Sequence, residues 1–167
     1  QDGEVWLDYW ALLRGGMGRI AIDAAQVRAT EPLDDFYGPF IEHLAREHRV
    51  ELYPYDWRRS VRDHAAGLAT LLQGLLAEAE HQGQALHIAA HSMGGIVARC
   101  MIADGGAGAS VWSRMGTLKA GSRLLMLGTP NQGSHEAVRW LTGFNPTQAK
   151  LALLDFTRGT DGLIDIV

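Results

Sequence analysis

The sequence predicts an α/β fold in which a parallel sheet is covered by helices on both faces. Three short apolar segments have the composition of buried strands, and they lie near residues 50, 86 and 124. Segments with helical periodicity separate them, and this alternation is typical of parallel sheets. With 167 residues, the chain is long enough for one domain with a core of its own. We therefore expect a single domain that spans residues 1–167.

The composition excludes several classes of function. A net charge of −4 gives no electrostatic footprint for nucleic acid. Cys100 is the only cysteine of the sequence, so no internal disulfide forms and no cysteine cluster binds a metal. We accordingly expect no metal and no cofactor. The single cysteine and the lack of a signal peptide at the start favour a cytoplasmic protein.

The most apolar window of the sequence lies at residues 85–103. It contains His87, His91 and Arg99, which a helix that spans a bilayer would have to place in lipid. The window therefore indicates a buried strand followed by a buried helix, and we expect no transmembrane segment.

Helices dominate the prediction for the start of the chain. An aromatic-rich stretch at residues 4–14 favours a short helix, whereas residues 17–33 show no clear period. Asp34 or Asp35 is expected to cap a helix that runs to about His48. The apolar side of this helix is expected to consist of Phe36, Phe40, Ile41 and Leu44.

A short strand and a long helix are expected next. Residues 50–53 predict the strand, which Pro54 ends. Ser60 is placed to cap an amphipathic helix that runs to about Gln82, where Gly83 closes it.

The second half of the chain alternates again between strands and helices. Residues 85–90 predict a strand and residues 93–103 a helix. The elements expected after them are a flexible glycine-rich connector at 105–108, one or two helical turns at 111–118, a strand at 124–127, and helices at 134–142 and 147–157.

Between the strand at 85–90 and the helix at 93–103 stands the segment Ala-His-Ser-Met-Gly-Gly, residues 90–95. A serine on a sharp strand-to-helix turn is a nucleophile elbow, which places the next backbone N–H beside a developing oxyanion. The usual pattern is G-x-S-x-G. Here Ala90 takes the first small position and Gly94 the second, and Gly95 adds room against neighbouring strands.

Two other interpretations of this segment remain open. It is compatible with a strand–turn–helix crossover that carries an incidental serine at position 92. A phosphate-binding loop of the Rossmann type fits less well, because the glycines follow Ser92 and no G-x-G-x-x-G follows the strand.

Three segments together resemble the lipase and lecithin–cholesterol acyltransferase branch of the α/β-hydrolases. They are Pro-Tyr-Asp-Trp-Arg at 54–58, the elbow at 90–95, and Leu-Gly-Thr-Pro-Asn-Gln-Gly-Ser at 127–134. The resemblance runs from about residue 5 to residue 134. It implies an acyl-ester substrate and a Ser–His–Asp mechanism, with Ser92 as the nucleophile and the N–H of Met93 as one oxyanion donor.

The sequence also departs from that pattern. Such hydrolases carry a strand with a Pro-Gly-rich loop before the region that corresponds to Val5, and that loop donates the second oxyanion N–H. Their triad acid and histidine come well after the segment at 127–134. We therefore expect an internal fragment of a larger hydrolase, which lacks the first oxyanion strand and the triad segment that follows.

Within the chain itself, one ordered triad is possible. His135 is the only histidine after Ser92, and Asp104 is the only acid between them. Asp104 is expected at the far end of the helix that begins at the elbow, roughly 17 Å from Ser92, which a histidine cannot bridge. His135 is kept as a possible base without an acid to orient it, and the chain alone is expected to be inactive.

Asp56 precedes the nucleophile and does not fit the hydrolase order of serine, acid, histidine. A structural ion pair with Arg58 or Arg59 is the favoured interpretation. Trp57 and His91 are possible parts of a substrate groove, although each also fits a packing role.

The remaining histidines are expected to be structural or solvated. His87 is predicted to be a core histidine on the buried strand. Those expected on solvated helix surfaces are His43, His48, His64 and His81.

Two classes of function follow. The first is a serine hydrolase or acyltransferase that acts on a lipid or carboxylic ester through an acyl-enzyme at Ser92. The alternative is a non-catalytic binding or scaffolding module that keeps the hydrolase fold. An acid and a histidine after residue 167 in the parent protein would favour the first.

Overall fold

The computed structural model describes residues 28–142 and residue 144, and these fall into two compact units. One unit contains residues 28–58 with the residues from Arg139 on, and the other is Arg59–Val138. The predicted helices at 4–14 and 147–157 lie outside the described residues.

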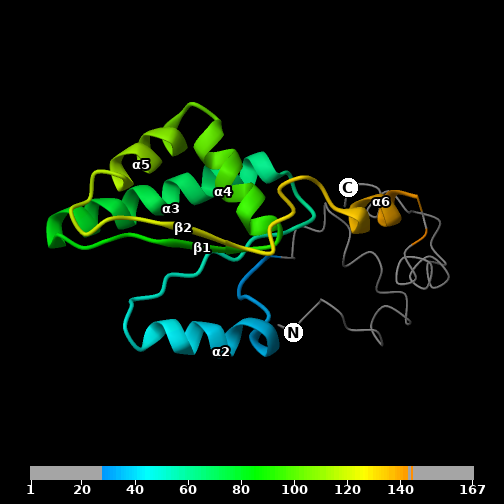
Figure 1. Ribbon diagram of the computed structural model, residues 1–167, viewed down its shortest axis with the longest axis horizontal. Helices are drawn as coiled ribbons and strands as arrows, with labels where there is room; N and C mark the ends of the chain where they lie inside the picture. Colours follow the sequence, from blue (N-terminus) through cyan, green and yellow to red (C-terminus); the bar gives the residue numbers. More distant parts are fainter. Residues whose placement is uncertain (1–27, 143, 145–167) are drawn as a thin grey trace. The chain divides into compact units, whose positions relative to one another are not determined.

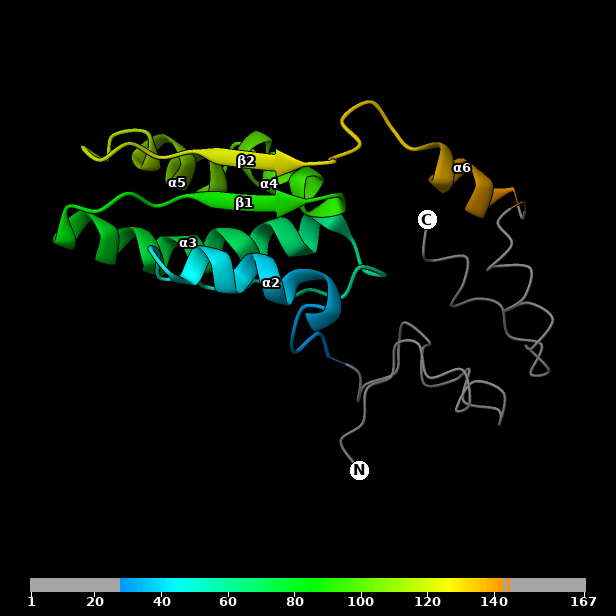
Figure 2. The same cartoon turned by 60° about the horizontal axis from the view of Figure 1, so that its bottom comes forward.

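The unit Arg59–Val138 is a mixed α/β structure with a two-stranded parallel sheet. Strand β1 (Ile88–His91) pairs with β2 (Leu124–Leu127) along the full length of both strands, so that Ile88 lies opposite Leu124 and His91 opposite Leu127. Figure 2 shows the two strands side by side, so that their carboxyl ends lie at the same edge. Helices α3 (Val61–Gln82), α4 (Met93–Ala103) and α5 (Ala107–Met115) lie together on one face of this sheet (Figure 1). This confirms a mixed α/β structure with a parallel sheet, whereas the predicted helices on both faces are not found among the described helices of this unit, which lie on one face.

Helix α3 is bounded as its sequence predicts. At its start the hydroxyl of Ser60 accepts a hydrogen bond from the N–H of Arg62 at 3.2 Å. At its end Gly83 adopts a left-handed conformation with φ of 68°, which glycine takes without a steric cost. The buried residues of α3 are His64, Ala65, Leu68, Ala69, Leu72, Leu76 and Ala79.

Helix α5 begins earlier than its sequence suggests. The glycine-rich run at 105–108 was predicted to be a connector, but the helix starts at Ala107 and includes Gly108. A Cβ atom on Gly108 would lie 2.5 Å from Cγ of Met101 and 3.0 Å from its carbonyl carbon. The glycine therefore lets α5 approach α4 closely, and the prediction of a connector there was wrong.

Within the unit Arg59–Val138, helices pack on one face of the sheet, and no described helix of this unit covers the other, which we call the open face. In β1, Ile88 and Ala90 are buried, whereas Ala89 and His91 are exposed. Their register partners on the open face include Leu125, which is half exposed. This alternation is typical of a sheet with helices packed on one side.

The other unit contains helix α2 (Asp34–Ala45). The residue at its N-cap is Leu33 and makes no side-chain cap bond, so the predicted cap at Asp34 or Asp35 was wrong. Both acids instead lie in the first turn, where they interact favourably with the helix dipole. None of its residues is buried.

Residues 50–53 do not form the predicted strand. They have no regular secondary structure, and in the described sheet β1 pairs with β2 alone. A strand is stabilised by hydrogen bonds to a neighbouring strand, and no such partner is described for this segment.

Candidate active site

Ser92 connects β1 to α4 and has a strained backbone. Its φ and ψ are 51° and −124°, and it is the only non-glycine residue with positive φ among those described. It is the N-cap residue of α4, yet its side chain makes no capping hydrogen bond. The residue is exposed. The predicted tight turn with a strained serine is therefore present, and its hydroxyl is not used for capping.

Several contacts hold this turn in place. The N–H of Ser92 donates to the carbonyl of Leu127, the last residue of β2, at 2.9 Å. The carbonyl of Ser92 accepts from the N–H of Gly95 at 3.1 Å. A strained conformation persists only where the surrounding structure fixes it, and such residues cluster at functional sites.

The close approach at Gly95 fulfils the sequence expectation that this glycine is required for packing. Gly95 is buried, and a Cβ atom there would lie 2.7 Å from Cγ2 and 2.8 Å from Cβ of Thr129. The hydroxyl of Thr129 is itself buried and has no hydrogen-bond partner among the described residues. The first turn of α4 therefore packs directly on the loop that follows β2.

Met93 is the first residue of α4 and is partly exposed. The first N–H groups of a helix have no partner inside the helix, and the helix dipole adds partial positive charge there. The backbone N–H of Met93 is therefore one of the donors that this helix end offers, as an oxyanion donor requires.

Asp104 lies at the opposite end of α4 from Ser92. It is the C-cap residue of this 11-residue helix, which separates the two by roughly 17 Å. Its carboxylate contacts the guanidinium of Arg62 at 3.4 Å, and both side chains are mostly exposed. The sequence predicts that Asp104 lies far from Ser92, and the structure agrees.

His135 is the first residue of helix α6 (His135–Leu141) and is exposed. It follows the loop that leaves the carboxyl end of β2. The hydroxyl of Ser134 accepts from the N–H of Glu136 at 3.2 Å and so caps the start of this helix. A role of His135 as a base stays a prediction.

Asp56 forms an ion pair with Arg58, one of the two arginines that the sequence offers as its partner. The Nε of Arg58 donates to Oδ1 at 2.8 Å and its Nη2 to Oδ2 at 2.7 Å, a two-pronged geometry. The backbone N–H of Arg58 adds a third bond to Oδ1 at 3.2 Å. Arg58 is buried at 7% exposure, so the pair fixes the turn around the partly exposed Trp57. A substrate contact at Trp57 stays a prediction.

Two tyrosines near this ion pair have raised pKa values. Burial raises the pKa of Tyr53. Burial also raises the pKa of Tyr55, and the neighbouring Tyr37 and Tyr53 add to that shift. The rings of Tyr53 and Tyr55 lie 6.1 Å apart between centroids. Both phenols therefore stay protonated at neutral pH, and neither acts as a base there.

The histidines differ from their predictions at two positions. His64 is buried at 8% exposure, although a solvated surface was predicted. It precedes the buried Leu68 by four residues on α3, so it lies on the buried face of that helix. His87 is exposed and precedes β1, and its Nδ1 accepts from the N–H of Arg123 at 3.1 Å.

The other histidines are exposed. His43 and His81 lie exposed on helices, as predicted, whereas His48 is exposed but lies beyond α2, which ends at Ala45 and not near His48. His91 is exposed on the open face of the sheet, where a Cβ atom on Gly128 would lie 4.0 Å from its Nε2. His91 thus lies beside the loop that follows β2, and a contact with substrate stays a prediction.

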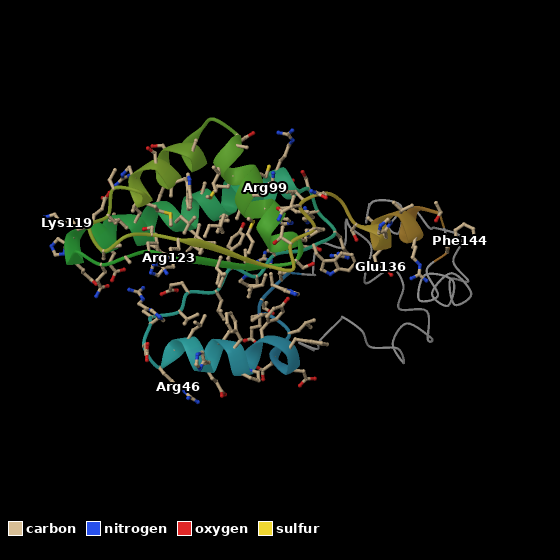
Figure 3. The ribbon with its side chains drawn as sticks, viewed as in Figure 1. Arg46, Arg99, Lys119, Arg123, Glu136 and Phe144 are labelled. Atoms are coloured by element: carbon tan, nitrogen blue, oxygen red, sulfur yellow. The ribbon has the colours of Figure 1, made fainter. Side chains whose placement is uncertain are left out.

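One polar contact between α4 and the loop after β2 was not anticipated from the sequence. Nη1 of Arg99 donates to Oδ1 of Asn131 at 2.8 Å. Figure 3 labels Arg99 on α4. Arg99 follows Gly95 by four residues and so lies on the same face of α4. That spacing, together with the polar residue inside the segment 127–134, was the signal available in the sequence.

Within the described part of the chain, no group of three or more His, Cys, Asp or Glu residues is placed to hold a metal ion. None of the described helices is both long and apolar enough to cross a membrane.

Comparison with known proteins adds no relative to this description. No family model, no curated protein and no solved structure matches the chain.

Proposed function

We propose that Ser92 is the nucleophile of a serine hydrolase or acyltransferase of the α/β-hydrolase type, which acts on a lipid or carboxylic ester. One observation carries the proposal: a serine with φ of 51° stands between a parallel strand and a helix, and its exposed side chain makes no cap bond. A serine that merely capped the helix would not need this strained backbone.

The chemistry follows from the position of Ser92. Its Oγ attacks the ester carbonyl carbon, forms a C–O bond and passes its proton to a base. The carbonyl oxygen becomes an oxyanion, for which the N–H of Met93 and the positive end of α4 are suitable partners. Collapse of the tetrahedral species expels the alcohol and leaves an acyl-enzyme, which water or a second alcohol resolves.

The base and acid of the proposed triad do not include Asp104. At roughly 17 Å from Ser92, its carboxylate cannot orient a histidine that reaches the serine. His135 is the one histidine of this sequence that follows Ser92, and Asp104 is the one acid between the two. The 167-residue chain alone should therefore cleave a short p-nitrophenyl ester no faster than its Ser92→Ala variant.

A non-catalytic module is the second candidate. The distance of Asp104 from Ser92 favours it, because the described residues contain no acid in the hydrolase order near the serine. Such a module would keep the strained turn as a relic and would use the surface around it for binding. A third possibility, a nucleotide-binding fold, expects an acidic residue on the strand after the glycines, and β2 consists of Leu-Leu-Met-Leu.

A covalent probe separates the two candidates. The full-length protein is treated with a fluorophosphonate, and the modified residue is identified by peptide mass spectrometry. The proposal expects one adduct, on Ser92, which Ser92→Ala removes and Ser60→Ala leaves in place. A folded protein that forms no adduct would favour the non-catalytic module, and an adduct on another serine would show that the nucleophile is elsewhere.

A further inference from the structure

The loop that follows β2, residues 128–134, is attached to α4 at successive points along one side of the helix. The first point is the backbone bond from Ser92 to Leu127, immediately before the loop, at 2.9 Å. The second is the packing of Thr129 on Gly95, and the third is the bond from Arg99 to Asn131 at 2.8 Å.

The loop also has internal order. The N–H of Asn131 donates to the carbonyl of Thr129 at 2.8 Å, and the N–H of Gly133 donates to the carbonyl of Pro130 at 3.1 Å. Gly128 and Gly133 have φ values of 59° and 97°, which glycine alone adopts readily. The loop therefore consists of tight turns, and its contacts with α4 determine its position.

Arg99 forms a side-chain hydrogen bond that connects this loop to α4. A second contact between the loop and α4 is the packing at Gly95, near the start of the loop. Asn131 lies further along, where the turn closed by its own N–H overlaps the turn closed by the N–H of Gly133. Without the bond to Arg99, this part of the loop would lose its side-chain hydrogen bond to α4.

We infer that Arg99 is a positioning residue for the reaction at Ser92: through Asn131 it holds residues 128–134 against α4 and so fixes the wall beside the serine. The inference rests on the proposed function, because it assigns the loop a place next to a reacting hydroxyl. Arg99 acts on the loop and not on the ester.

The exposure of the pair determines what a substitution changes. Arg99 and Asn131 are both exposed, and surface pairs contribute little to the free energy of unfolding. Removal of the bond should therefore leave the melting temperature nearly unchanged while the loop loses its position. Small displacements at a reacting centre lower rates by large factors.

The first test follows the loop itself, without reference to activity. Hydrogen exchange of the backbone amides of Asn131 and Gly133 is measured by NMR in the wild type and in Arg99→Ala. The inference expects exchange faster in the variant by between about twofold and fivefold, the effect of losing a surface pair. The matched control is Arg62→Ala, which removes an exposed arginine bonded to Asp104 at the other end of α4. Equal exchange in wild type and Arg99→Ala would overturn the inference.

The second test measures inactivation by the fluorophosphonate in the full-length protein. Arg99→Ala and Asn131→Ala are each expected to lower the maximal inactivation rate by between about tenfold and a hundredfold, with little change in the half-saturating concentration. The double variant should be no slower than either single variant, because one bond is lost in all three. Asn131→Asp keeps the acceptor oxygen and is expected to retain the wild-type rate.

The outcomes separate this inference from the proposed function. Inactivation that depends on Ser92 but is unaffected by Arg99→Ala would support the nucleophile and reject the positioning role. A loss in Arg99→Ala but not in Asn131→Ala would also reject it, and would indicate that Arg99 contacts the ligand directly. If the wild type is not inactivated at all, the proposed function fails and the positioning role fails with it, whatever the exchange rates show of the loop.

Discussion

Two helices of the same compact unit begin at a serine, and the two serines differ in backbone and in use. At the start of α3, Ser60 has φ of −55° and ψ of 132°, and its hydroxyl accepts the N–H of Arg62. At the start of α4, Ser92 has φ of 51° and ψ of −124°, and its hydroxyl makes no cap bond. A serine at the N-cap thus has an unstrained backbone and caps the helix in one case. In the other case its backbone is strained and its hydroxyl makes no cap bond.

The contrast shows how a structural serine is distinguished from a chemical one. A cap bond stabilises a helix end by satisfying a backbone N–H that has no other partner. At Ser92 that stabilisation is missing and backbone strain is added, so the local cost has to be offset by its surroundings. The four predictions below test this distinction.

The largest effect is expected on turnover. In the full-length protein Ser92→Ala should lower ester hydrolysis by about three orders of magnitude or more, because the nucleophile is removed. Ser60→Ala should retain the wild-type kcat, since its hydroxyl serves only the helix end. Similar losses in the two variants, measured at equal folded fraction, would show that the two serines do not differ in the way we describe.

The next effect concerns the turn that precedes α3 in the chain. Asp56→Asn removes the carboxylate charge that pairs with the buried Arg58 and should lower the free energy of unfolding by about 3 kcal/mol. Turnover at saturating substrate should fall much less than in Ser92→Ala. Urea unfolding and initial rates measure the two quantities. An unchanged unfolding midpoint with a loss of turnover near that of Ser92→Ala would make Asp56 catalytic.

The third prediction tests how α4 is held beside the serine. Gly95→Val should lower the free energy of unfolding by about 1–3 kcal/mol or more, because its side chain would collide with Thr129. The matched control is Gly74→Ala on α3, where nothing lies within 4 Å of the added Cβ. That variant should gain about 0.5–1 kcal/mol. Thermal melting measures both, and a wild-type melting temperature for Gly95→Val would show that α4 is not docked as described.

The smallest effect concerns the free energy of unfolding, which should change in opposite directions when the serine at each helix start is replaced. Ser60→Ala removes a cap bond and should cost about 1 kcal/mol. Ser92→Gly relieves a positive φ and should gain about 1 kcal/mol after the backbone entropy of glycine is counted. Chemical unfolding resolves changes of this size. A loss of stability in Ser92→Gly would mean that the backbone of Ser92 is not strained.

Local chemistry made much of the compact unit predictable from its sequence. The cap at Ser60 and the closing Gly83 were both expected, because each depends on a few neighbouring residues. The elbow at Ser92 belongs to the same class, since small residues on both sides predict the close approach of strand and helix. The strand at 124–127 was also expected, and here the partner strand β1 is present.

The predictions that failed depend on contacts between distant segments. Gly108 was predicted to belong to a connector. A glycine is required there because Met101, on another helix, leaves no room for a side chain, and the local sequence does not show this contact. Residues 50–53 have strand-like composition, but a strand also needs a partner. The link from Arg99 to Asn131 spans 32 positions, and the spacing of Arg99 from Gly95 indicates only the face of α4 on which Arg99 lies. The burial of His64 was different, because its spacing from Leu68 already indicated the buried face.

The close approach of Gly95 to Thr129 has an evolutionary consequence. The two positions share one small volume, so a larger residue at one is compatible with folding only if the other becomes smaller. Homologues should therefore exchange size between these positions, with alanine at 95 accompanied by glycine at 129, because the Cβ of residue 129 would itself lie 2.8 Å from the added Cβ. A lineage that carries the first change alone would be under selection to acquire the second, and reversal of either would then be harmful in the new background.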